Sequence, residues 1–222
     1  EIITPIRDLQ LSREAEISYL KEKGVEMNFE KAAYSINKGL WGTSVGGRET
    51  LSSRGMLPEE AWPTQVTQTG SQEVKLSFEK GELKAINDDI FKHPSEAIQY
   101  LQSIAGPYGI GRDIHVGDTI IGIKGRVGFE AAAPMVILKA HHALEKHVLT
   151  KWQLNWKDQL AQFYGNWLHE GQILDPVMRD IEGYLETSQR NVTGDVYVQL
   201  HPYRFQFFFS SRRRHTRFDC DW

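Results

Sequence analysis

Apolar and polar residues alternate along some parts of the chain and recur every three or four positions along others, which indicates mixed strands and helices. Residues 72–86 alternate around Lys80-Gly81 and predict a β-hairpin. Residues 93–106 carry apolar side chains at helical spacing, include an early proline suited to a first turn, and end at a glycine, so they predict a helix. Residues 194–206 alternate again and predict a strand.

The same rules predict further elements on both sides of these. Residues 11–24 form a helix with a serine cap, and residues 152–168 place their aromatic side chains on one broad helical stripe. Another helix begins at Asp175. The apolar runs 118–130 and 134–140 are interpreted as strands. Because helices and strands follow one another irregularly, the fold class is α+β rather than a doubly wound sheet.

One long excursion interrupts these elements. Residues 42–73 are rich in glycine, serine and threonine, with little periodicity. Loops of this length inside a compact domain are usually either functional or disordered. We therefore expect a role for this segment beyond connecting two strands.

Composition places the chain among globular proteins. Its 222 residues are 40% hydrophobic and 25% charged, with a formal net charge of −3. No apolar run approaches the ~20 residues of a membrane-spanning helix. A single cysteine excludes a disulfide framework and a thiolate metal cluster, and it favours the cytoplasm.

The two ends of the chain read differently from its middle. The first eight residues resemble a short strand taken from inside a domain, so we expect a fragment of a longer protein. Residues 207–222 show no helical or strand period and contain the arginine cluster 212–214. A basic tail is one interpretation, with nucleic acid as its partner; a non-native, adapter-like tail is the interpretation we adopt.

The candidate chemical motifs are weak on spacing alone. His141 and Glu145 share a helical face as two metal ligands would, but no third ligand joins them, so no metal site is predicted. The glycines of residues 109–128 lie among strand residues and are better explained as bulges or turns than as a phosphate loop. Ser35 and Ser44 have no neighbouring base, so they are hydrogen-bonding groups, and no catalytic side chain is predicted.

Four ordered segments carry a resemblance to a known family. Residues 34–44, with a serine at each end of "SINKGLWGTS", resemble the signature segment of the argininosuccinate synthases. Residues 4–25, 108–134 and 169–200 resemble further segments of that family in the same order. The resemblance covers residues 1 to about 206.

This resemblance implies a domain organisation. Residues 1–28 correspond to the end of an α/β nucleotide-binding domain, residues 29–206 to the synthetase domain, which binds citrulline and mediates multimerisation, and residues 207–222 to the tail. Members of the family ligate citrulline and aspartate through a citrullyl-adenylate, releasing AMP and pyrophosphate from ATP bound with Mg²⁺. The resemblance also implies a cytoplasmic homotetramer in arginine biosynthesis, with neither a membrane nor a nucleic-acid partner.

The resemblance assigns substrate-binding residues one by one. Ser35 and Ser44 match the family's citrulline-binding serines. The family's citrulline-binding glutamate falls at Gly117 and its tyrosine at Phe129. Asp118, the next residue, is a candidate replacement for the missing carboxylate, and Phe129 is a tentative contact. A branch that holds the amino-acid end of citrulline in another way is the alternative.

Two other functions stay open from the sequence. In the first, the chain is a non-catalytic oligomerisation module with the aromatic helix 152–168 as its interface. In the second, it is part of a related ATP-pyrophosphate-releasing ligase that acts on another ureido or amide substrate. The family's pyrophosphate loop, adenine contacts and aspartate contacts precede the region matched here. We therefore expect the 222-residue chain alone neither to bind ATP tightly nor to turn over.

Overall fold

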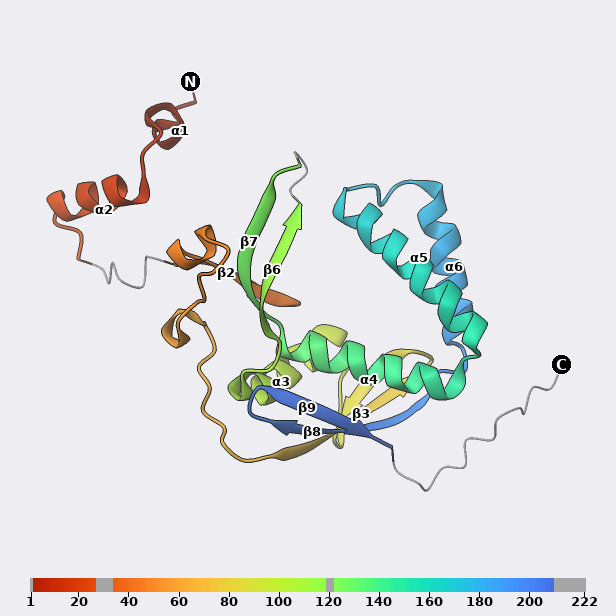
Figure 1. Cartoon of the computed structure of the whole chain (residues 1–222). Coiled ribbons are helices and arrows are strands. Elements are labelled where there is room, and N and C mark those ends of the chain that lie inside the picture. The colour runs from red at the N-terminus through yellow and green to blue at the C-terminus, as the bar shows by residue number, and fades with distance from the viewer. Residues whose placement is uncertain (1, 27–33, 119–121, 210–222) are drawn as a thin grey trace.

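A computed structural model of the chain describes residues 2–26, 34–118 and 122–209 and contains two antiparallel sheets with helices packed on and beside them (Figure 1). The predicted α+β class is confirmed, because helices and antiparallel strands follow one another without βα alternation. The N-terminal helices α1 (Pro5–Leu9) and α2 (Arg13–Glu22) stand apart from both sheets in Figure 1. The first of these replaces the short strand expected from residues 1–8, since a proline in its first turn favours a helix.

A five-stranded sheet has the order β5-β4-β3-β8-β9. Its strands are β3 (Gln72–Glu79), β4 (Glu82–Ile86), β5 (Asp89–Ile90), β8 (Gly194–His201) and β9 (Arg204–Phe208). The predicted hairpin of residues 72–86 is confirmed, and Lys80 and Gly81 form its turn with φ angles of 51° and 83°. The last strand includes Phe207 and Phe208, the first two residues of the segment interpreted as a tail. Residues 210–222 lie outside the described part.

One face of this sheet carries the main hydrophobic core. Helices α3 (Pro94–Ala105) and α4 (Ala132–Val148) cover it (Figure 1). Alternate side chains of β3 and β8 point inward, so Leu76 and Leu200 are fully buried against Leu101 and Leu144 of the two helices. The predicted helix of residues 93–106 is confirmed, with His93 as its N-cap and Gly106 after its last residue.

The strand expected at residues 134–140 is wrong, because these residues belong to α4. Pro134 fits in the first helical turn, where its missing N–H needs no intrahelical partner. Helix α4 continues to Val148 with no proline or glycine after Pro134, and it buries one side of that length. A short apolar run is compatible with either a buried helix or a buried strand, so its pattern alone does not decide between them.

A four-stranded sheet has the order β1-β2-β7-β6. Its strands are β1 (Ser35–Gly39), β2 (Gly42–Gly46), β6 (Arg112–Asp118) and β7 (Lys124–Glu130). The residues between β2 and β3 contain two short 3₁₀ helices, η2 (Arg48–Leu51) and η3 (Glu59–Ala61). Leu57 and Ala61 of this segment pack on Val45 of β2, so the long excursion covers one face of the sheet.

Two helices form a hairpin beyond the end of α4 (Figure 1). These are α5 (Lys151–His169), capped by Thr150, and α6 (Pro176–Gln189), capped by Asp175. No described residue of α5 is buried, and Trp152 and Trp156 are 68% and 57% exposed, so the aromatic stripe does not face a core of this chain.

Candidate functional site

The four-stranded sheet has one face covered by the 47–65 segment and one face open to solvent within the described part of the chain. Directly paired residues of antiparallel strands project to the same face. Asn37 pairs with Ser44, Ser44 with Phe129, and Phe129 with Asp113, so these four form a row across all four strands. We call the face that carries this row the open face.

The open face holds both serines of the signature segment. The structure places Ser35 and Ser44 in β1 and β2, because residues 35–46 form a β-hairpin. Ser35 pairs with Gly46, two residues from Ser44, which puts the serines roughly 7–8 Å apart on one face. The Asn37 Nδ2 donates to Ser44 Oγ over 3.4 Å, which leaves the Ser44 hydroxyl hydrogen able to donate elsewhere.

Phe129 lies directly beside these serines on the open face. A Cβ added at Gly42 would come within 2.3 Å of Phe129 Cζ, so the phenyl ring crosses over this glycine. The phenyl side chain is 37% exposed. The two serines and Phe129, assigned separately from the sequence, are therefore brought together by the sheet.

Asp118 projects in the other direction. Its register with Lys124 places it in line with Ile114 and Val116, on the face opposite Ser44 and Phe129. The Lys124 Nζ lies 2.6 Å from Asp118 Oδ1, and both side chains are exposed. Neighbouring residues of a strand project to opposite faces of the sheet. The Asp118 carboxylate would reach the open face only if the register of β6 shifted by one residue, which is more than a small backbone adjustment.

Gly117 does lie on the open face, and a histidine occupies the space next to it. A Cβ added at Gly117 would lie 3.1 Å from His115 Nε2, so the imidazole leans along β6 over the glycine. His115 and Asp113 alternate with Ile114 and therefore share the open face with Phe129. Sequence reasoning missed both residues, although their alternation in "RDIHVGD" would have placed them once the pairing of β6 with β7 was known.

A hollow of about 570 Å³ opens beside this row, and we call it the α4 hollow. Several parts of the fold line it. The open face contributes Asp113, His115 and Phe129, the turn between β1 and β2 contributes Trp41, and the start of α4 contributes Met135 and Leu138. Tyr203, in the turn after β8, and Arg204 and Phe205 at the start of β9 line it as well. Its size is within the usual range of small-molecule sites.

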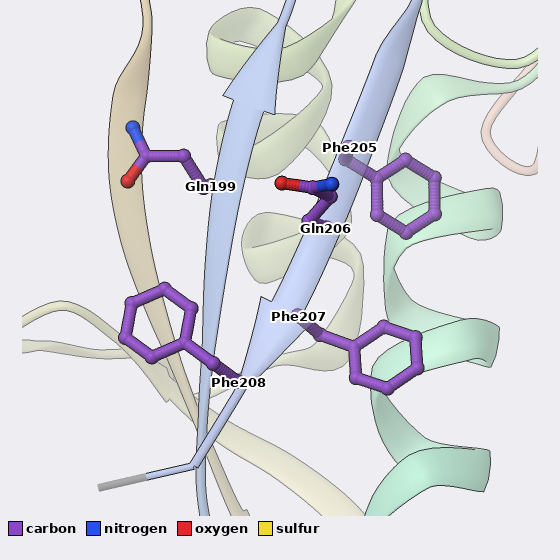
Figure 2. A pocket seen from close by; sticks show the side chains of 5 residues that line it. All are labelled: Gln199, Phe205, Gln206, Phe207 and Phe208. Atoms are coloured by element: carbon purple, nitrogen blue, oxygen red, sulfur yellow. The ribbon is translucent and has the colours of Figure 1, made fainter.

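A second hollow, of about 600 Å³, lies at the edge strand β9 and is shown in Figure 2. Phe205 and Phe207 point toward α4, whereas Gln199 and Phe208 point to the other side of the sheet (Figure 2). Among its lining residues there is no charged group. This hollow therefore offers fewer polar and charged groups to a ligand than the α4 hollow does, and neither serine lines it.

The covered face is held by buried charges. Arg112, with a side chain only 7% exposed, binds both carboxylate oxygens of Glu59 at 2.9 Å and the carbonyl oxygen of Thr64. The Thr64 hydroxyl donates to Glu130 Oε1 over 2.7 Å. These groups bind one another on the covered face of β6, so we interpret them as structural support for the open face.

The histidine-rich part of α4 forms a structural network. Glu145 is fully buried, and its Oε2 lies 2.7 Å from Lys157 Nζ and 3.4 Å from His142 Nδ1. Gln189 Nε2 donates to Glu145 Oε1 over 2.8 Å. Burial is the main cause that lowers the pKa of His141. Within the described ranges, no three histidine, cysteine or acidic side chains are grouped as a metal site would require.

Across residues 2–26, 34–118 and 122–209, no helix has the length and apolar character needed to cross a membrane.

Comparison with known proteins identifies the family of the chain. A family model described as the arginosuccinate synthase C-terminal domain matches residues 34–216. The chain is 38% identical over 203 residues to an argininosuccinate synthase of Methanocaldococcus jannaschii, covering 90% of the chain and 51% of that relative. It is 35% identical over 211 residues to an argininosuccinate synthase of Xanthomonas campestris, covering 90% of the chain and 52% of the relative. The chain spans about half the length of these curated relatives, and it belongs to the argininosuccinate synthase family.

Proposed function

We propose that the protein containing this chain is a cytoplasmic, homotetrameric ligase that joins citrulline and aspartate in arginine biosynthesis. In this reaction the ureido oxygen of citrulline attacks the α-phosphate of ATP, and pyrophosphate leaves. The aspartate amine then displaces AMP from the citrullyl-adenylate. The observation that supports this most directly is the row of Asn37, Ser44 and Phe129 on the open face, within a family of argininosuccinate synthases.

The role we propose for the open face is positioning. Ser35 and Ser44 offer hydroxyl groups that donate and accept hydrogen bonds without carrying charge, which suits a neutral ureido group. The hydrogen bond from Asn37 occupies one acceptor site of Ser44 Oγ and orients the remaining donor. Catalysis by these residues is the alignment of the ureido oxygen for attack, not covalent chemistry.

ATP with its Mg²⁺ is a co-substrate in this proposal, and none of the residues described here is assigned to it. The four-stranded sheet presents hydroxyl, aromatic and carboxylate groups on its open face rather than a glycine-rich loop at a helix N-terminus. The contribution that we assign to this chain is therefore the binding of an amino-acid substrate.

A substitution of Ser44 tests the proposal in the full-length protein. Steady-state pyrophosphate release should require ATP, citrulline and aspartate together, because aspartate clears the citrullyl-adenylate for the next turnover. Ser44→Ala should raise the citrulline KM about fivefold or more, as expected for one neutral hydrogen bond. Ser77→Ala, on the five-stranded sheet, is the matched control and should change nothing. An unchanged citrulline KM in Ser44→Ala would contradict the role of this face.

Two observations favour a second candidate, a ligase for a different ureido or amide substrate. Gly117 removes the family's carboxylate from the open face, and Phe129 removes a hydroxyl. A panel of ureido and amide amino acids, assayed by pyrophosphate release with the full-length protein, separates the candidates. Citrulline should give the highest kcat/KM if the first proposal holds.

A further inference from the structure

One side of α5 carries an aromatic stripe that packing within the described part of the chain does not bury. Four ring-bearing residues share this side of the helix: Trp152, Trp156, Phe163 and Trp167. They fall within an arc of about 60°, because an α-helix has about 3.6 residues per turn. The Phe163 and Trp167 rings contact each other, with centroids 4.8 Å apart. We call these four residues the α5 stripe.

The surface beside the α5 stripe carries amides instead of charges. Four amide side chains follow one flank of it: Asn155, Gln159, Gln162 and Asn166. The charged Lys157 lies on another side of the helix, where its Nζ is 2.7 Å from Glu145 of α4. Interface centres are rich in aromatic and poor in charged side chains, whereas a solvent-facing helix surface usually carries charges. A helix that binds a membrane surface usually carries lysines or arginines along its polar face, so the composition favours a protein partner.

The spacing of the α5 stripe is the same from either end, which favours a second copy of this chain as the partner. The two tryptophans at its start are four positions apart, the Phe163–Trp167 pair is also four positions apart, and seven positions separate the two pairs. When two copies of α5 run antiparallel with their centres at Gln159, Trp152 of one copy lies at the level of Trp167 of the other. Trp156 lies at the level of Phe163 in the same alignment. Each of these pairs forms twice, as contacts around a two-fold axis do.

The two ends of α5 carry opposite charges. Lys151 is the first residue of the helix, and its Nζ lies 5.2 Å from the centroid of the Trp152 ring. Glu170 follows the last residue of the helix. Antiparallel copies bring the lysine of each close to the glutamate of the other, whereas parallel copies bring like charges together at both ends. The end charges therefore favour the antiparallel alignment.

The exposed aromatic area suits one contact within a larger assembly. Trp152 and Trp156 are more than half exposed, and Phe163 is 39% exposed. Since a buried aromatic side chain removes ~150–250 Å² from water, two copies of the α5 stripe supply about 800 Å². The flanking amides extend this area toward the ~1,200–2,000 Å² that specific interfaces bury in total.

We propose that the α5 stripe is a contact between two copies of this chain, in which two α5 helices pack antiparallel about a two-fold axis near Gln159. The contact goes beyond the proposed reaction, since no residue of the stripe lines the α4 hollow. It assigns one surface to the proposed homotetramer and rests on the proposed function for the number of subunits alone.

Light scattering on the full-length protein tests the contact. The double variant Trp152→Glu, Trp156→Glu places charges where the two helices meet, so its mass in solution should be half that of the unmodified protein. Far-ultraviolet circular dichroism should not change, because both side chains are already exposed in this chain. Ile90→Glu, at an apolar residue that is 83% exposed on β5, is the matched control and should keep the full mass.

Cross-linking tests the alignment of the two helices. In a background whose other cysteines are replaced by serine, a short bismaleimide should join two copies of Gln159→Cys. It should not join two copies of Lys151→Cys, because antiparallel packing about Gln159 separates them by roughly 25 Å. Cross-linking at both positions would indicate parallel helices, and cross-linking at neither would indicate no contact. Either result would overturn the proposal.

The remaining outcomes separate the contact from the proposed reaction. An unmodified full-length protein that is monomeric, or a double variant that keeps the full mass, overturns the contact while pyrophosphate release with citrulline, aspartate and ATP still decides the reaction. A halved mass without pyrophosphate release from the unmodified protein supports the contact and overturns the reaction. Co-sedimentation with phosphatidylcholine–phosphatidylserine vesicles that is lost in the double variant would assign the α5 stripe to a membrane surface and overturn the contact.

Discussion

Replacement of Glu145 should detach the α5–α6 hairpin from α4. The carboxylate is fully buried and accepts hydrogen bonds from Lys157 Nζ at 2.7 Å and Gln189 Nε2 at 2.8 Å. Lys157 comes from α5 and Gln189 from the end of α6, so one carboxylate links both helices to α4. Glu145→Ala removes both contacts and leaves Lys157, only 16% exposed, with the more exposed carboxylate of Asp158 at 3.3 Å as its remaining counter-charge.

The size of the effect follows from the loss of the buried carboxylate that faces Lys157. Breaking a buried ion pair by removing one partner costs about 3–5 kcal/mol, and the partial exposure of the lysine favours the lower end. A loss of about 3 kcal/mol corresponds to a decrease in Tm of roughly 6–12 °C for a chain of this size. We expect Glu145→Gln to lose less than the alanine variant, because the amide oxygen still accepts hydrogen bonds.

Urea unfolding followed by circular dichroism and tryptophan fluorescence measures this loss. Trp152 and Trp156 lie on α5 and report on the hairpin, whereas circular dichroism reports on all helices. The double variant Glu145→Gln, Lys157→Met should recover at least half of the stability lost in Glu145→Ala, because no buried charge remains. A loss below about 1 kcal/mol in Glu145→Ala, or no recovery in the double variant, would refute the reasoning.

Three further predictions concern other parts of the chain. Phe129→Tyr adds a hydroxyl to the open face, and it should lower the citrulline KM of the full-length protein about fivefold, measured by initial rates; an increase would contradict that placement. Arg126→Gln removes the hydrogen bonds that hold the 47–65 segment on the sheet, so limited trypsin digestion should cleave faster after the exposed Arg54. An unchanged cleavage rate would show that Arg126 does not hold this segment. Because burial lowers the pKa of His141, the unfolded chain binds its proton first, and stability should fall as the pH drops below about 6.5. Urea midpoints between pH 8 and pH 5.5 should shift less in His141→Gln than in His142→Gln, and equal shifts would contradict the assignment to His141.

Elements with strong local signals could be predicted from the sequence. Ser12 and Asp175 accept hydrogen bonds from backbone N–H groups at the start of α2 and α6, as capping residues do, and both helices were expected there. The hairpin turn at Lys80-Gly81 depends on two adjacent residues and was expected in the same way. Residues 134–140 have no such marker, and only packing against the five-stranded sheet selects the helix over a strand.

The candidate site depends on register, which spacing along one strand cannot supply. Gly117 and Asp118 are neighbours in sequence, yet they project to opposite faces of the sheet. Asp113 and Tyr203 are far apart in the chain, and both line the α4 hollow because the turn before β9 packs on the residues before β6. Family resemblance therefore found Ser44, whereas the lining of the α4 hollow required the three-dimensional arrangement.

Arg126 holds the segment that lies over the covered face through contacts with its main chain, which do not depend on the side chains at the contacted residues. The guanidinium donates to the main-chain oxygens of Glu49, Ser52 and Gly55, and to none of the side chains there. A Cβ at Gly55 would lie 2.1 Å from the carbonyl oxygen of Glu49, so this glycine is fixed. At residues 51–54, whose side chains are exposed, a clamp on the peptide backbone tolerates most substitutions. Substitutions at these residues should therefore leave the four-stranded sheet beneath them unchanged. New sequence could be inserted there while the open face, on the other side of the sheet, keeps its shape.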